Sequence, residues 1–233
     1  MATYACSDLH GNWELWTEIK KFLKPDDTLY YLGDSTDRGP DGWAILKEML
    51  EDDRVIYIAG NHDIMLADRI KNPLDYHTAS LHYANGGEPT WQDAENDPEA
   101  LEIAKKIDSL PAYAVYTSTF GLNVFMSHSG STNISDREDL IWDRSEYITY
   151  TNHTDYDVIV HGHTTIPHLI KDIEDVHHFY FQDKEEEVFK CPEWEGGAYW
   201  YHGYRCDIDC CTIMTRQTVL LNLDTFDEEI FQL

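Results

Sequence analysis

The sequence has few basic side chains and no long apolar run. Lysine and arginine together number 17 against 44 aspartates and glutamates, which gives the 233-residue chain a formal charge of −27. A chain this acidic should repel duplex nucleic acid and anionic membrane surfaces, whose partners normally present clustered basic residues. Its apolar runs are shorter than the roughly 18 to 20 residues that cross a bilayer, and its first residues do not resemble a signal peptide. We therefore expect a cytoplasmic protein that binds neither a nucleic-acid duplex nor a membrane.

Cysteine is also scarce. The five cysteines are Cys6, Cys191, Cys206, Cys210 and Cys211, and no pair has the Cys-x-x-Cys spacing. An odd number without that spacing disfavours both a disulfide framework and a zinc knuckle. A zinc site formed by the last three is the less favoured alternative, because adjacent cysteines rarely fit one tetrahedral shell. We expect free thiols in a reducing compartment.

The chain nevertheless contains enough apolar residues for a buried core. Hydrophobic residues make up 42% of it and aromatic residues 13%, and its length suits one globular domain. Strand-like and helix-like segments alternate from the start: strands are expected over 2–7, 28–32 and 55–59, and helices over 12–23, 41–50 and from about 61. This alternation predicts an α/β sheet.

The rest of the chain is less regular. A polar stretch with several Pro and Gly residues, around 72–110, suggests a cap or insertion, with a helix near 98–108. Further strands are expected over 112–118, 122–127, 157–160, 176–181, 204–208, 212–215 and 219–223. We treat residues 1–233 as a single domain that contains this insertion and an acidic, variable segment around 172–203. No pattern in the sequence indicates an oligomeric state.

Side chains that can bind metals follow the predicted strands. Asp8 and His10 follow the first strand, Asp34 the second, and Asn61 and His62 the third. In open α/β sheets the carboxyl ends of the strands meet at the edge where ligands bind. Two later strands end at His128 and His163. Five strand ends could therefore supply one site.

These residues stand in recognisable motifs. They are Asp-x-His-Gly at 8–11, Gly-Asp-Ser-Thr-Asp-Arg-Gly at 33–39, Gly-Asn-His-Asp at 60–63, then His128 and Gly-His-Thr at 162–164. In order and approximate spacing they resemble the calcineurin-like metallophosphoesterases. Within that superfamily the chain is most similar to the phosphoprotein phosphatase branch, especially the small bacterial and phage enzymes related to lambda phosphatase. The resemblance implies a four-layer αββα sandwich with mixed β-sheets.

The resemblance also implies a pair of metal ions. Asp8, His10 and Asp34 would hold the first cation, and Asp34, Asn61, His128 and His163 would hold the second, with Asp34 bridging the two. Such an oxygen and nitrogen shell suits manganese, iron or zinc better than copper(I) or an iron–sulfur cluster, and we expect manganese. Two divalent cations can polarise a bridging hydroxide for in-line attack and neutralise phosphate oxygens.

The resemblance gives the neighbouring residues roles as well. His62 would protonate the leaving oxygen, and Asp37 would orient it by fixing the tautomer of its ring. Arg38 and Arg144 match the two arginines with which this family binds phosphate oxygens, and Asn61 would contact the substrate as well as a metal ion. The alternative for the two arginines is an ordinary salt bridge at the surface.

Two neighbouring histidines are alternative candidates for one ligand position. His161 and His163 lie on one face of the same strand end, and we choose His163 as the ligand because it follows glycine in the Gly-His-Thr pattern. The broader superfamily often has a further histidine two residues later, where this chain has Thr165, which favours the phosphoprotein phosphatase branch. The remaining histidines fit no motif, and we expect them at the surface or partly buried: His77, His82, His153, His168, His177, His178 and His202.

We therefore predict a metal-dependent phosphomonoesterase acting on phosphoserine and phosphothreonine, with phosphotyrosine as a further substrate. The alternative is a symmetrical dinucleoside tetraphosphate hydrolase or another small-molecule phosphoesterase. Relatives of that kind usually lack the carboxylate at the position of Asp37. A catalytically silent phosphate-binding module is disfavoured, because no ligand or acid of the motifs is missing.

Overall fold

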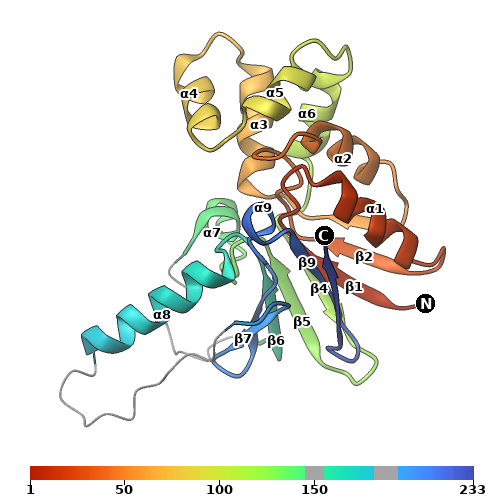
Figure 1. Ribbon diagram of the computed structural model, residues 1–233, viewed down its shortest axis with the longest axis vertical. Helices are drawn as coiled ribbons and strands as arrows, with labels where there is room; N and C mark the ends of the chain where they lie inside the picture. The colour runs from red at the N-terminus through yellow and green to blue at the C-terminus, as the bar shows by residue number, and fades with distance from the viewer. Residues whose placement is uncertain (145–154, 181–193) are drawn as a thin grey trace.

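Two five-stranded mixed sheets form the centre of the molecule (Figure 1). The computed structural model describes residues 1–144, 155–180 and 194–233. The first sheet has the order β10-β9-β1-β2-β3, formed by β1 (Thr3–Cys6), β2 (Thr28–Tyr31), β3 (Val55–Tyr57), β9 (Gln217–Asn222) and β10 (Glu228–Gln232). Strands β1, β2 and β3 are parallel, so their carboxyl ends meet at one edge.

The second sheet has the order β4-β5-β6-β8-β7. It consists of β4 (Tyr113–Thr117), β5 (Asn123–Ser127), β6 (Val158–His161), β7 (Tyr199–Tyr201) and β8 (Arg205–Asp207). Strands β4 and β5, both expected from the sequence, form an antiparallel hairpin, while β5, β6 and β8 are parallel. The ends of β5 and β6 therefore bring His128 and His163 to a shared edge as well.

Apolar side chains fill the space between the two sheets and cover their outer faces. Leu32 and Ile58, which directly follow β2 and β3, and Leu221 of β9 share one buried cluster with Met126 and Val160 from the second sheet. Helices α1 (Trp13–Phe22), α2 (Gly42–Met49) and α3 (Asn61–Lys71) pack outside the first sheet, and α7 (Arg137–Trp142) and α8 (Ile166–Tyr180) outside the second. The predicted αββα layering is confirmed.

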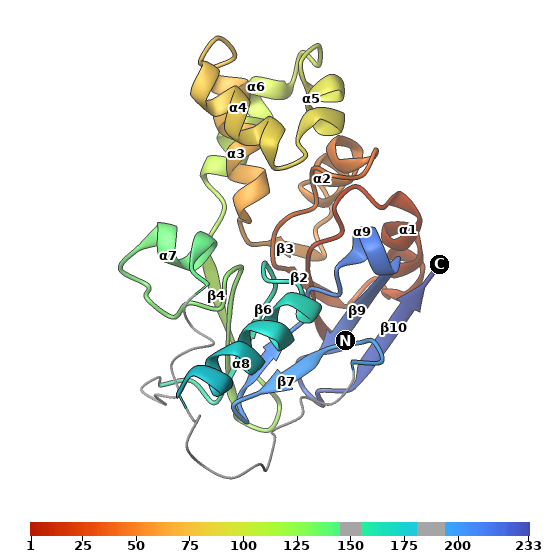
Figure 2. The ribbon, with the colours of Figure 1, turned by 60° about the vertical axis from the view of Figure 1, so that its left-hand side comes forward.

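A separate group of helices extends beyond α3 at one end of the molecule (Figures 1 and 2). It contains α4 (Tyr76–Ala84), α5 (Glu88–Ala94) and α6 (Ala100–Asp108), which we call the helical lobe. These helices lie within the predicted insertion, and α6 confirms the helix expected near 98–108. Buried Ile103, Ala104 and Ile107 recur at helical spacing on α6 and join the core beside α3.

Two predicted strands are helical in the structure. Residues 176–180 continue α8, which begins with Ile166, Leu169 and Ile173 buried at helical spacing. The short apolar run that suggested a strand is the end of this longer helix, and such runs do not distinguish the two structures. Residues Thr212–Thr215 form the single turn α9. Cys211 and Arg216 flank that turn with left-handed φ angles of 56° and 54°.

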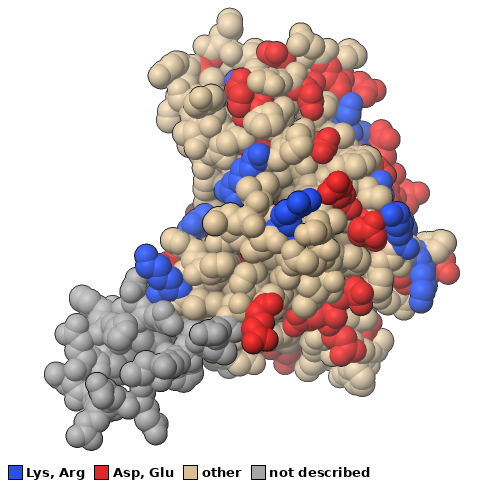
Figure 3. Space-filling model, in the orientation of Figure 1, with Lys and Arg blue, Asp and Glu red and all other residues tan. Residues whose placement is uncertain are grey.

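Within the acidic segment predicted over 172–203, residues 172–180 belong to α8 and residues 194–203 contain strand β7, while residues 181–193 lie outside the described ranges. Across the described residues no helix is long and apolar enough to span a membrane. Figure 3 shows basic side chains mainly across the middle of one face, with acidic ones toward the helical lobe and the lower edge.

Candidate active site

The loops after β1, β2 and β3 form one buried polar layer. Asp8, His10, Asp34, Asn61 and His62 are each at most 4% exposed. Backbone hydrogen bonds tie the first two loops together: the Asp8 amide donates to the Gly33 carbonyl at 3.1 Å and the His10 amide to the Asp34 carbonyl at 3.1 Å. The side chains predicted from the strand ends therefore do converge.

The backbone of this layer is unusual. Positive φ angles occur at Asp8 (53°), His10 (45°) and Asp34 (61°), and also at Asp37, Arg38 and His163. Residues other than glycine adopt this conformation only when their surroundings hold them in it. Gly60 shows how closely the loops pack, because a Cβ at that position would collide with the Asp34 carboxylate.

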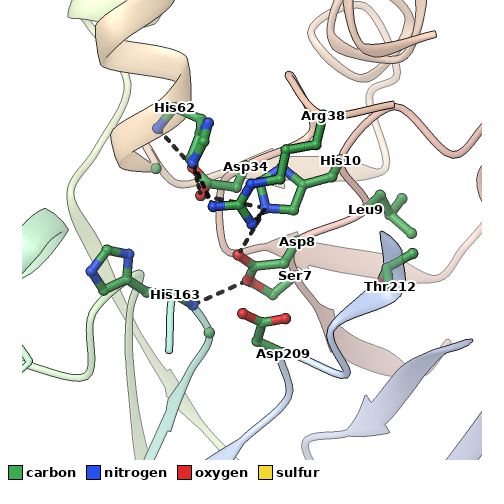
Figure 4. A network of polar contacts seen from close by, with 12 residues as sticks. Ser7, Asp8, Leu9, His10, Asp34, Arg38, His62, His163, Asp209 and Thr212 are labelled. Carbon is green, nitrogen blue, oxygen red and sulfur yellow. Dashed lines mark hydrogen bonds and ion pairs between the residues drawn. The ribbon is translucent and has the colours of Figure 1, made fainter. Parts of the chain in front are cut away.

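The first candidate metal group consists of His10, Asp34 and His62, with Asp8 beside it (Figure 4). The sequence predicted Asp8 as the third ligand of this group and His62 as the acid. Asp34 Oδ2 lies 4.0 Å from His10 Nε2 and 3.9 Å from His62 Nε2, and Asp8 Oδ1 lies 3.8 Å from His10 Nε2. The Thr36 carbonyl accepts from His10 Nδ1 at 2.8 Å, so Nε2 is the nitrogen that faces the group.

The second candidate group draws on both sheets. His128 Nε2 lies 3.3 Å from Asp34 Oδ2, and Asn61 Oδ1 lies 3.0 Å from His128 Nε2 and 2.9 Å from His163 Nδ1. His128 Nδ1 donates to the Leu32 carbonyl at 2.6 Å, so its other nitrogen points at the group. Asp34 belongs to both groups, as a bridging ligand must.

The charge states of these side chains fit divalent cations. Burial, and then the Arg38 guanidinium, lower the pKa of His10 to about 3, and burial and His128 lower that of His163 well below its usual range. Both rings are therefore neutral and keep a lone pair at neutral pH. Although burial favours a neutral carboxyl, His128 and the neighbouring imidazoles hold the pKa of Asp34 well below its ordinary value. Burial opposes charge on His128, but Asp34 raises its pKa to about 9, so this ring must give up a proton before it can bind a cation. Carboxylate and imidazole donors of this kind suit manganese, iron or zinc.

His62 has a carboxylate partner behind it. Asp37 is fully buried, and its Oδ2 accepts from His62 Nδ1 at 2.8 Å. Burial opposes the charge of Asp37, but the hydrogen bonds that it accepts hold the pKa of this carboxyl below its usual value. His62 Nε2 faces the site, where it accepts from Arg38 Nη2 at 3.0 Å.

Both predicted arginines reach the site. Arg38 Nη1 also donates to His10 Nε2 at 2.8 Å, so its guanidinium spans the two rings of the first group. Arg144 Nε donates to His163 Nε2 at 3.1 Å, beside the second group. The contacts of both arginines place cationic donors next to the candidate metal ligands.

The residues passed over as ligands lie elsewhere. His161 is buried, but its Nε2 pairs with the Tyr201 hydroxyl at 2.7 Å and takes no part in either metal group. The described cysteines are free and absent from both groups, and Cys191 lies outside the described residues.

A hollow of about 360 Å³ opens beside His10, lined by Asn12, Trp13, Pro40 and Ile213.

Comparison with known protein families agrees with this geometry. Residues 1–206 match the family model of the calcineurin-like phosphoesterases. The chain belongs to this family. Members are metal-dependent phosphoester hydrolases, so the two buried groups of this phosphoesterase are its candidate metal centre.

Curated relatives match a smaller part of the phosphoesterase. A symmetrical bis(5'-nucleosyl)-tetraphosphatase of Buchnera aphidicola is 40% identical over 70 residues, and one of Nitrosospira multiformis is 37% identical over 70 residues. These matches cover 28% of this chain and span only 26% of the length of each relative. They leave the substrate of the whole protein open.

Solved structures share the fold over nearly the whole chain. A metallophosphoesterase from Sphaerobacter thermophilus superposes with a TM-score of 0.60 at 14% identity, covering 100% of this chain and 88% of that one. A mutant cold-active protein tyrosine phosphatase gives a TM-score of 0.55 at 16% identity, covering 99% and 80%. At these identities the likeness shows a common architecture.

Three buried side chains around the site were not predicted from the sequence. Asp63 is the last residue of the Gly-Asn-His-Asp motif, which could have pointed to it, and its carboxylate accepts from the Asp34 and Gly60 amides, each at 3.1 Å. Asp209 lies near Asp8 in Figure 4, and burial and Asp8 raise its pKa well above the usual range. His82, expected at the surface or partly buried, is fully buried and bonded to Asp37, so that expectation was wrong.

Proposed function

We propose that this phosphoesterase removes phosphate from phosphoserine and phosphothreonine, with phosphotyrosine as a further substrate. The observation that supports it is the buried pair formed by His62 and Asp37, whose 2.8 Å hydrogen bond aims His62 Nε2 into the site. A phosphomonoester with a poor leaving group needs an acid at its leaving oxygen, and a positioned imidazole is suited to that task.

The side chains around this pair would have separate roles in phosphate binding and proton donation. Arg38 and Arg144 would hold the phosphate oxygens, because their guanidinium donors already point at the candidate metal ligands. The Asn61 amide would contribute both to the metal and to the bound phosphate. His62, once doubly protonated, would give the Nε2 proton to the leaving oxygen while Asp37 keeps the ring in place.

Asp8, His10 and Asp34 would hold one cation, and Asp34, Asn61, His128 and His163 the other. We propose manganese for both positions, since the donors are oxygen and nitrogen only. Cations bound there lower the pKa of water and neutralise phosphate charge. The hollow beside His10 leaves room for the rest of the substrate.

A second candidate is the symmetrical hydrolysis of dinucleoside tetraphosphates. It is favoured by the 70-residue matches to proteins that carry this name. A phosphoanhydride releases a better leaving group than a serine ester does, so it depends less on an acid. The buried Asp37 behind His62 therefore favours the phosphomonoester.

The test is phosphate release from phosphoserine and phosphothreonine peptides, with diadenosine tetraphosphate as the competing substrate. Chelator-stripped protein is compared with the same sample after manganese is restored. We expect metal-dependent release from the peptides at a higher kcat/KM than for the dinucleotide. Turnover of the dinucleotide alone would replace the first function with the second.

A further inference from the structure

The second oxygen of Asp37 is held by a residue of the helical lobe. His82, on α4, lies 45 positions along the chain, yet its Nε2 is 2.9 Å from Asp37 Oδ1. Both side chains are fully buried. Asp37 therefore has one imidazole on each oxygen: His62, which faces the site, and His82, which does not.

Arg69 fixes the direction of this contact. Its Nη1 lies 3.3 Å from His82 Nδ1, and a guanidinium can only donate. His82 Nδ1 must therefore accept, which leaves the ring proton on Nε2 to be donated to Asp37. Arg69 in turn lies 4.2 Å from the centre of the Trp91 ring and 3.4 Å from a Glu88 oxygen, so α5 holds it in place.

The lobe also holds the backbone on which Asp37 stands. The Asp37 amide donates to Thr90 Oγ1 at 2.7 Å, and the Arg38 amide donates to the Gly86 carbonyl at 2.8 Å. Asp37 and Arg38 have φ angles of 68° and 64°, a conformation that needs such support. Gly87 lets the turn between α4 and α5 pass beside the His82 ring, since a Cβ there would overlap that ring.

We propose that His82 is a positioning residue for the reaction: it holds the Asp37 carboxylate in the orientation that aligns His62 with the leaving oxygen. This inference rests on the proposed function, because it gives His82 a task only if His62 acts as the acid. The helical lobe would then support the reaction by fixing Asp37, without itself contacting the substrate.

The effect should depend on the leaving group. An alkoxide such as that of serine needs a proton at departure, whereas nitrophenolate leaves readily without one. Loss of His82 should therefore slow hydrolysis of a phosphoserine peptide much more than hydrolysis of p-nitrophenyl phosphate. General damage to the fold or to metal binding would slow both substrates together.

The experiment compares His82→Leu and His82→Gln in the manganese-loaded full chain. His82→Leu should lower kcat on the phosphoserine peptide by roughly 10- to 100-fold, the range for residues that orient a functional side chain, with KM little changed. On p-nitrophenyl phosphate its kcat should fall less than about threefold. His82→Gln retains an N–H donor and should recover most of the lost peptide turnover.

The matched control is His77→Leu, which makes the same substitution at an exposed position of α4. It should leave both turnovers unchanged. Bound manganese should be equal in all variants. Equal losses on the two substrates, or unchanged peptide turnover in His82→Leu, would overturn the proposal.

A spectroscopic measurement needs no variant to fold. In protein labelled with 15N-histidine, His82 should be the neutral tautomer with its proton on Nε2. The opposite tautomer would contradict the hydrogen bond to Asp37. Wild-type turnover of the peptide tests the proposed function separately, whereas the tautomer and the ratio of variant to wild type test His82.

Discussion

The two sheets contribute to the site in different ways. The first sheet supplies loops that are bonded to one another, so that Asp8 and His10 are fixed by the backbone of Gly33 and Asp34. The second sheet supplies single imidazoles that take their orientation from the first: His128 donates to the Leu32 carbonyl, and the His163 amide donates to Asp8. The loops of the first sheet therefore hold one another in place, and the second sheet adds two histidines whose orientation depends on them.

Asp34 is the point at which the two contributions meet, so its loss should have the largest effect. Asp34→Ala removes a carboxylate shared by both candidate metal groups, and we expect manganese and activity to disappear together. His62→Ala should instead lower kcat by about 100- to 10,000-fold while manganese stays bound. Metal analysis and peptide turnover on the two variants give the comparison, and equal metal loss in both would contradict the assigned roles.

Removing one ligand from each sheet sharpens the contrast. His10→Ala should release only the cation of the first group, and His163→Ala only that of the second, so each variant should keep about one of two manganese ions. Activity should fall by roughly 10-fold or more in both. Titration with manganese, followed by metal analysis, measures the stoichiometry. His161→Gln, a change at the neighbouring buried histidine, should keep both ions.

The smallest effect is expected away from the site, where the turn between α5 and α6 meets α2. Asp97 accepts from Lys47 at 2.6 Å and from Trp43 at 2.8 Å, and these bonds lower its pKa to about 2. A lowered pKa stabilises the fold above about pH 4, the ordinary range of aspartate, and this stabilisation disappears as the pH falls toward 2.

Asp97→Asn should therefore cost about 1 kcal/mol or less at pH 7, as for other partly exposed ion pairs, and less still at pH 3. Urea unfolding at the two pH values measures the difference. Asp93→Asn, at an exposed position of α5, is the matched control. A cost that does not shrink at the lower pH would show that the ion pair is not its source.

The sequence predicted the strand ends well because each candidate ligand of the first sheet follows its strand within a few residues. His128 and His163 could be found from the motifs for the same reason. The single turn at Thr212–Thr215 and the end of α8 were mistaken for strands, since short apolar runs carry little periodicity. His82 could not be placed at all, because its contact with Asp37 depends on how α4 packs 45 residues away.

The left-handed backbone conformations at the site lower the stability of the fold at positions whose side chains the proposed activity needs. Within the described part of the chain, six of the ten non-glycine residues with positive φ are Asp8, His10, Asp34, Asp37, Arg38 and His163. Such residues cost roughly 1 kcal/mol or more each, and glycine would relieve much of that cost. A search for thermostable variants should therefore select glycine at these positions, and each such gain would remove a side chain on which the proposed chemistry depends.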